Sequence, residues 1–162
     1  MALDPNILNS LSKQVPRIAR PQIEKRFRAA FQKVKNEMIA EFLNHPVTIE
    51  IKGGIGAKNL SGTLDGITNL FSFIGFDSSS DPTSQIENML YKTNFKFDRY
   101  TNKEIIYSVY IPDAKEIFEV TPIPWATGRS WAKGIETGIS GLGYYLKVDR
   151  DNSRSGLGIC RI

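Results

Sequence analysis

Few residues in this 162-residue chain could do chemistry, and their spacing assembles no site. The one histidine, His45, and the one cysteine, Cys160, cannot build a zinc site within the chain. A catalytic triad would need His45 as its base, but no G-x-S-x-G nucleophile motif accompanies it. His45 stands before Pro46 at the expected end of a helix, so we expect it to be structural. Cys160 is expected to be an incidental thiol, which suits a chain made in a reducing compartment.

Four aspartates could supply oxygen ligands to a hard cation, but they lack the spacing of a calcium-binding loop. They are Asp65, Asp77, Asp81 and Asp98. Asp77 and Asp81 flank a run of serines, a pattern that turn formation and helix capping explain better. We therefore expect no metal and no cofactor.

Glu136 is the carboxylate that best suits hydrolytic chemistry, because it lies among glycines and close to Trp131. The simpler interpretation is that Glu136 pairs with a neighbouring cation, Arg129 or Lys133. We expect the chain not to be an enzyme. A small hydrolase built on Glu136, Asp65 or His45 is the third hypothesis.

Phosphate binding is suggested by two features, a glycine loop and a basic segment. Gly53-Gly-Ile-Gly56 lacks the Gly-Lys-Ser/Thr of a P-loop, so a flexible loop is expected. The formal net charge is +4, and cations concentrate between residues 17 and 35. This segment is a solvated helix face or a phosphate-binding face. The candidate phosphate contacts are Arg17, Arg20, Lys25 and Arg28.

Aromatic residues are abundant, with nine Phe, six Tyr and two Trp. The segment Phe95-Lys-Phe-Asp-Arg-Tyr100 interleaves aromatic and charged residues, as surfaces that stack nucleic-acid bases do. The glycines of an RNP motif are missing, however. Burial in a core or in an interface is the favoured role of these aromatics.

A long helix is the clearest element that the sequence predicts. Its apolar residues recur every three or four positions, at Ile23, Phe27, Phe31, Val34, Met38 and Phe42. Pro16 and Pro21 mark the approach to it, Pro21 is expected in its first turn, and Asn44-His-Pro46 is expected to end it. About 22 residues would run ~33 Å. Residues 1–15 are expected to form a short turn or arm.

The rest of the chain predicts strands with short helices between them. Strands are expected at 47–52, 69–76, 95–97, 105–111 and 144–148, and at 157–162 as an edge strand or free tail. Short helices are expected at 82–91 and 130–137, with Asp81 as an N-cap and Pro82 in the first turn of the former, and a helical turn is expected at 113–118. This pattern predicts an α+β fold, a long N-terminal helix packed on a mixed, largely antiparallel sheet with two short helices. One domain is expected over residues 16–150, with arms at 1–15 and 151–162.

One family resemblance accompanies these patterns. Four segments carry it: Asn69-Leu-Phe-Ser-Phe-Ile-Gly-Phe76 followed by Asp81-Pro82; Pro122-Ile-Pro-Trp125; Gly128-Arg-Ser-Trp-Ala-Lys-Gly-Ile-Glu136; and Ser153-Arg-Ser-Gly156. Together they resemble virion proteins of tailed phages, most closely the small neck or tail-completion proteins that join head to tail. The resemblance covers roughly residues 47–160 and has no catalytic signature.

The resemblance implies a homo-oligomeric ring of identical copies around the DNA channel. Its implied partners are further copies, portal or adaptor proteins, tail proteins and DNA passing through the lumen. The protein would be made in the host cytoplasm and localise to the virion; no membrane partner and no signal peptide are expected. The interface candidates are Phe71, Phe73, Trp125, Arg129 and Trp131, since Trp and Arg dominate interface energies. The alternative hypothesis is a nucleic-acid-binding module that uses the basic helix 17–35.

Overall fold

The computed structural model describes residues 5–64, 66, 68–101, 104–137, 146–148 and 159–161. The chain divides into two compact units, where the sequence pattern predicts one domain over 16–150. Unit 1 comprises residues 1–44 and 87–112, and unit 2 comprises residues 45–86 and 113–162. The predicted α+β class with a long N-terminal helix is confirmed.

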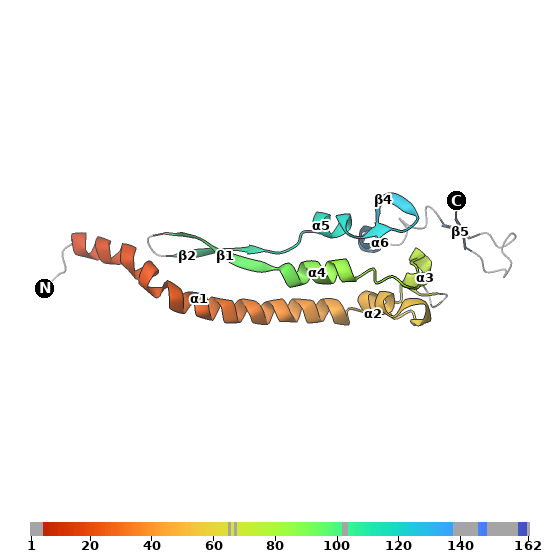
Figure 1. Ribbon diagram of the computed structural model, residues 1–162, viewed down its shortest axis with the longest axis horizontal. Helices are drawn as coiled ribbons and strands as arrows, with labels where there is room; N and C mark the ends of the chain where they lie inside the picture. Colours follow the sequence, from red (N-terminus) through yellow and green to blue (C-terminus); the bar gives the residue numbers. More distant parts are fainter. Residues whose placement is uncertain are drawn as a thin grey trace. The chain divides into compact units, whose positions relative to one another are not determined.

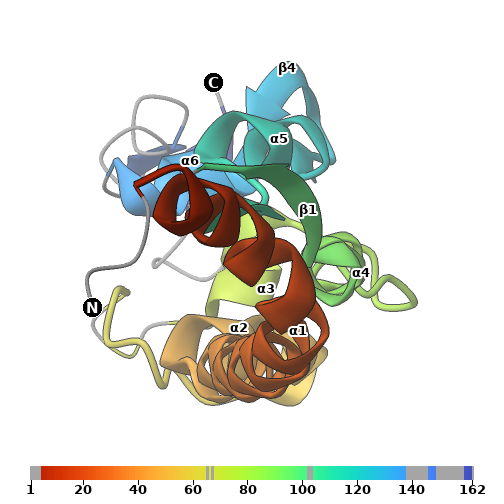
Figure 2. The ribbon, with the colours of Figure 1, turned by 90° about the vertical axis from the view of Figure 1, so that its left-hand side faces the viewer.

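Helix α1 of unit 1 spans Pro5–Asn44, which is 40 residues. Residues 5–15 are therefore helical, and the prediction of a turn or arm there is wrong. Pro16 and Pro21 lie inside the helix. A proline removes one backbone hydrogen bond and its ring crowds the preceding turn, so the helix bends instead of ending. The bend separates the first turns of α1 from the rest of the helix in Figures 1 and 2.

The predicted hairpin is confirmed in unit 1 as β1, Asn94–Tyr100, paired antiparallel with β2, Ile105–Tyr110. A register shift between Phe97 and Arg99 marks a β-bulge. The hairpin lies beside α1 in Figure 1, and an aromatic cluster joins them. The Phe27 ring stacks on Tyr107 at 4.8 Å and meets Phe95 edge-on at 4.9 Å.

Helix α4, Ser84–Lys92, leads into β1, and the sequence predicts it to within two residues. The Asp81 carboxylate accepts hydrogen bonds from the Thr83 N–H and hydroxyl, which orders the chain just before the helix. In unit 1 the Lys35 Nζ donates to the carbonyls of Tyr91 and Thr93, at 2.6 and 2.9 Å. Lys35 of α1 therefore caps the C-terminal end of α4.

Residues 47–52 and 69–76 were predicted as strands, and both predictions are wrong. Unit 2 begins with helix α2, Pro46–Lys52, then a 3-10 turn η1, Gly54–Gly56, and helix α3, Leu70–Ile74. Helix caps override the β-like apolar pattern in both places. His45 accepts the Val47 N–H at the start of α2, and Asn69 accepts the Ser72 N–H at the start of α3.

The remainder of unit 2 contains α5, Ala114–Glu119, a short hairpin of β3, Pro122–Ile123, with β4, Ala126–Ser130, and then α6, Trp131–Glu136. Helices α5 and α6 confirm the predictions at 113–118 and 130–137. The extended segment that Pro122 and Pro124 predict contributes β3. The buried apolar residues of this unit include Ile51, Leu70, Phe71, Ile74, Ile123 and Trp131.

The last described strands, β5, Leu146–Val148, and β6, Ile159–Arg161, pair antiparallel. Strand β5 agrees with the prediction at 144–148 and β6 with a final strand. Residues 144–145, 157–158 and 162, which complete those predicted segments, lie outside the described residues, as do residues 151–156 of the predicted C-terminal arm. No helix in the described part of the chain has both the length and the apolar character needed to span a membrane.

Candidate assembly interface

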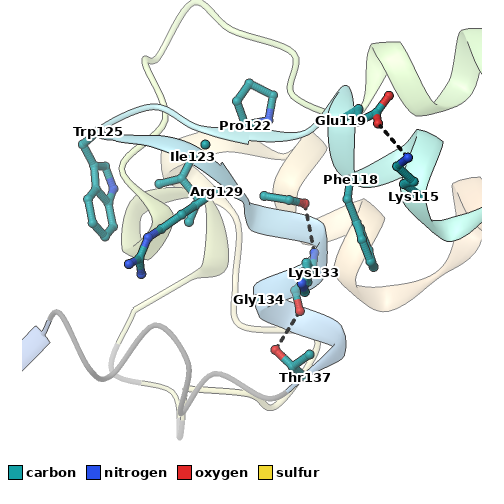
Figure 3. A pocket seen from close by; sticks show the side chains of 12 residues that line it. Lys115, Phe118, Glu119, Pro122, Ile123, Trp125, Arg129, Lys133, Gly134 and Thr137 are labelled. Atoms are coloured by element: carbon teal, nitrogen blue, oxygen red, sulfur yellow. Dashed lines mark hydrogen bonds and ion pairs between the residues drawn. The ribbon is translucent and has the colours of Figure 1, made fainter.

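A recess of about 750 Å³ opens on unit 2 between α5, α6 and the β3–β4 hairpin (Figure 3). Three cations and two aromatic rings line it: Lys115, Arg129, Lys133, Phe118 and Trp125. In Figure 3 Trp125 and Arg129 extend from the hairpin on one side, and Phe118 lies on the other. We call this surface the basic recess.

The basic recess has a positive charge balance among its described lining residues. Glu119 is the one acid that the structure places in this lining, and it lies 4.0 Å from the Lys115 ammonium. Both members of that pair are exposed, so their attraction is weak. Arg129 and Lys133 add further positive charge at exposed positions. The recess is therefore suited to an anionic group flanked by an aromatic surface.

Hydrogen bonds hold the frame of the recess in one arrangement. The Ser130 hydroxyl accepts the Lys133 N–H at 3.1 Å and so caps α6. It also lies 2.7 Å from the Thr121 hydroxyl, and the Trp131 N–H donates to the Thr121 carbonyl at 2.8 Å. These bonds tie the end of β4 and the start of α6 to the segment after α5.

The five interface candidates take three different positions. Phe71 and Trp131 are 1% and 5% exposed and form part of the core of unit 2, where each contacts the Phe76 ring. Phe73 is half-buried. Trp125 and Arg129 line the basic recess, and the Trp125 indole N–H donates to the Ile74 carbonyl at 2.6 Å. The structure thus brings together two of the five at one accessible surface.

The candidate phosphate contacts on α1 are mostly turned toward the hairpin. The guanidinium groups of Arg17, Arg20 and Arg28 lie 5.9, 4.0 and 5.1 Å from the ring centres of Tyr100, Phe97 and Phe95, respectively. Such cation–π contacts help to hold the helix on β1. Residue spacing cannot show this arrangement, because the rings lie 67 to 83 residues away in sequence. Lys25 is exposed.

Glu50 is a buried charged residue that the sequence interpretation missed. Its side chain is fully buried, although the expected strand places it on the solvent face. The carboxylate accepts the Leu70 N–H at 2.6 Å and the Ser61 N–H at 2.8 Å, and the Asn59 amide donates at 3.4 Å. These donors account for its burial, and Glu50 fastens the 53–69 segment to α2. A helical interpretation of 46–52, started by the His45-Pro46 pair, could have signalled it.

The other residues that the sequence suggested for catalysis or metal binding have separate positions. His45 caps α2, Asp98 pairs with Arg99 at 2.9 Å, and Glu136 is an exposed residue at the end of α6. Asp65 lies outside the described residues, and Cys160 is in β6 opposite Lys147. Among the residues that the structure describes, no group of three or more His, Cys, Asp or Glu is arranged to hold a metal ion.

Helix α1 carries an exposed apolar row on its N-terminal half. Ile7, Leu11, Val15 and Ile18 are spaced by four, four and three residues, and each is about half exposed or more, up to 75% at Ile18. Further along, Ile23 and Val34 of the predicted stripe are also exposed. Phe27 and Phe31 of the same stripe contact the hairpin rings. Only part of the predicted apolar stripe is therefore covered by unit 1.

Comparisons with known proteins returned no match: no family model, no curated protein and no solved structure resembles this chain at a significant level.

Proposed function

We propose that this chain is a structural protein of a tailed-phage virion. It forms a homo-oligomeric ring in the neck or at the top of the tail, contacts portal or adaptor proteins and tail proteins, and joins head to tail. The sequence resemblance over residues 47–160 suggests the virion class. The observation that carries the assembly role is the exposed apolar row Ile7, Leu11, Val15 and Ile18 on α1.

This row supports assembly because apolar side chains that are exposed to water do not stabilise a monomer. Apolar side chains that repeat on one helix face are normally buried, and an exposed run of them marks a contact surface. Unit 1 is also thin, since α1 is joined by a hairpin that, in the described residues, has two strands. Two-stranded sheets are marginal alone and gain stability when another element covers them.

The test is the oligomeric state of the purified chain and its place in the particle. We expect light scattering coupled to size exclusion to give a mass of several copies, and negative-stain images to show rings. Cryo-electron microscopy of the source phage should then place the chain between head and tail. A compact monomer at high concentration, together with its absence from purified particles, would refute the proposal.

A nucleic-acid-binding module is the second candidate, and the cations of α1 that lie away from the hairpin rings favour it. Lys25 and Arg26 are exposed, and the cation–π contacts among the described residues of unit 1 are made by Arg17, Arg20 and Arg28 instead. Duplex DNA binding would weaken steeply with salt, because phosphate contacts release counterions. Lys25→Gln with Arg26→Gln should lower the slope of log K against log salt by about 2. An affinity that is flat with salt would remove this candidate.

A further inference from the structure

The hairpin of unit 1 has two strand edges that no further strand covers in the described part of the chain. Its sheet contains β1 and β2, so each strand bonds to the other along one side. The opposite side of each strand presents backbone N–H and C=O groups without a strand partner. Open edges of this kind bind further strands, and proteins usually cover them, charge them or close them into a barrel.

The backbone groups at the open edge of β2 can be assigned from the end of the hairpin. The Thr101 N–H donates to the Glu104 carbonyl at 3.0 Å, so the backbone of Glu104 points toward β1. Backbone groups alternate in direction along a strand, and the extra residue of the bulge lies in β1, so β2 keeps a regular alternation. Ile105, Tyr107 and Val109 therefore direct their N–H and C=O groups to the open edge.

Strand β2 presents this edge without charged side chains. Residues 105–111 are Ile-Ile-Tyr-Ser-Val-Tyr-Ile, and Val109 and Ile111 are 45% and 57% exposed. An uncharged run of β-branched and aromatic residues at an open edge is the pattern that pairs most readily with another strand. The open edge of β2 is therefore a strand-binding surface.

Strand β1 carries charged side chains on the face that points away from α1. Lys96 and Asp98 are exposed, whereas Phe95 and Phe97 alternate with them and contact side chains of α1. Within the hairpin Lys96 lies opposite Ser108, so a charged residue of β1 has an uncharged neighbour on β2. This pairing avoids the like-charge neighbours that destabilise a sheet.

We propose that copies of this chain join hairpin to hairpin, with the open edge of β2 in one copy paired antiparallel with the open edge of β1 in the next. The occupant is a second copy because this pairing repeats the combination found within the hairpin, a charged β1 beside an uncharged β2. It also uses both open edges of every copy. Pairing β2 with β2 would leave the β1 edges open, and pairing β1 with β1 would leave the β2 edges open.

The contact is heterologous, so it repeats from copy to copy and closes into a ring when the rotation between copies allows. Closure leaves no open strand edge, because every β2 edge then meets a β1 edge. The inference names the subunit contact of the proposed ring, and it rests on that proposal for ring closure.

A charge placed on β2 tests the contact. Val109→Lys should weaken self-association at least tenfold, because the new ammonium would lose water beside the strand of the next copy. Val34→Lys is the matched control, since Val34 is 62% exposed on α1 and the same substitution there should leave association unchanged. Sedimentation velocity measures the association, and circular dichroism should show the same fold in both variants. Equal association of the two variants would contradict the contact.

Disulfide cross-linking identifies the paired strands. Ser108→Cys and Lys96→Cys lie on the same face of the hairpin and are made in separate chains, each with Cys160→Ser. A disulfide between these two variants must therefore join two copies. Their mixture should form a heterodimeric disulfide on oxidation, much faster than either variant forms a homodimeric one.

The register between copies decides which position of β1 reacts. Asn94→Cys and Asp98→Cys, used in turn in place of Lys96→Cys, cover a shift of two residues in either direction. Lys33→Cys, at a site 79% exposed on α1, should give no heterodimer with Ser108→Cys.

Three results would overturn the inference: a monomeric wild type, the absence of a heterodimer at all three β1 positions, or a Ser108→Cys homodimer that forms faster than every heterodimer. The last result would show that β2 pairs with β2. Placement of the chain in particles tests the proposed function separately. A ring that assembles without these disulfides refutes the contact alone, whereas absence from particles refutes the virion role alone.

Discussion

At the scale of single residues, Glu50 is a fully buried carboxylate that connects three segments of unit 2. A buried carboxylate is tolerated only when hydrogen-bond donors replace the water that it loses. Here the donors come from Leu70, Ser61 and Asn59, at positions 9 to 20 residues away in sequence. The Leu70 N–H is at the start of α3, where a negative charge also interacts favourably with the helix dipole.

We expect Glu50→Gln to lower the free energy of unfolding by about 2–4 kcal/mol. The amide NH₂ that replaces one oxygen cannot accept the backbone N–H groups that the carboxylate accepts. Urea unfolding followed by circular dichroism measures the change. Glu119→Gln is the control, since its ion pair is exposed and its loss should cost less than about 0.5 kcal/mol. Equal stability of the two variants would contradict this role for Glu50.

At the scale of elements, α3 shows how a short apolar run becomes a helix. Asn69 caps its start, and Gly75 ends it in the left-handed conformation with φ of 79°. The Gly75 N–H donates to the carbonyls of Phe71 and Ser72, which closes the last turn. The run Leu70–Ile74 is too short to show a helical period, so its caps carry the information.

Gly75→Ala should destabilise the protein by about 1–2 kcal/mol, because a β-carbon disfavours the left-handed conformation. Thermal unfolding is a suitable measurement. Gly56→Ala makes the same change where φ is not positive and no atom lies within 4 Å of the new β-carbon. That variant should be neutral or stabilised by up to about 1 kcal/mol. A Gly56 effect as large as the Gly75 effect would show that backbone conformation is not the cause.

In unit 1, the Lys35 ammonium of α1 binds the C-terminal end of α4. Lys35 donates to two carbonyls at the end of α4, where the helix dipole is negative. Lys35→Met keeps the aliphatic stem and should cost about 1–2 kcal/mol in the free energy of unfolding. Lys33→Met, which removes an exposed pair with Glu37 at 3.8 Å, should change it by less than about 0.5 kcal/mol. Chemical denaturation of both variants decides whether the cap matters.

At the scale of the whole molecule, both units expose surfaces that could bind other proteins. The N-terminal half of α1 displays an apolar row, and unit 2 displays a recess lined by cations and an exposed segment at 77–81 with two aspartates. A protein with such surfaces is expected to function as part of an assembly.

Leu11→Gln with Val15→Gln should weaken self-association while leaving the free energy of unfolding of the monomer within about 0.5 kcal/mol, because both side chains are exposed. Sedimentation velocity at several concentrations measures the association. Lys13→Gln with Gln14→Ala alters neighbouring polar positions of the same helix and should have little effect. If the first pair unfolds the monomer instead, the row belongs to an intramolecular core.

The sequence by itself determined the elements whose signals are local. The spacing of Phe27 and Phe31 predicts the helix, the β-branched and aromatic run at 105–111 predicts the hairpin strand, and Asp81-Pro82 predicts that a helix follows, as α4 does. Those signals work because helical period, strand propensity and capping depend on neighbours a few positions away.

Only the tertiary structure decided which residues are buried and which distant residues are in contact. It made helices of residues 47–52 and 69–76, enclosed Glu50, placed three α1 arginines over the rings of β1, and gathered Trp125 and Arg129 at one recess. Each of these outcomes depends on contacts between residues far apart in the chain. An apolar run of five residues satisfies a strand or a helix equally well until such contacts select one.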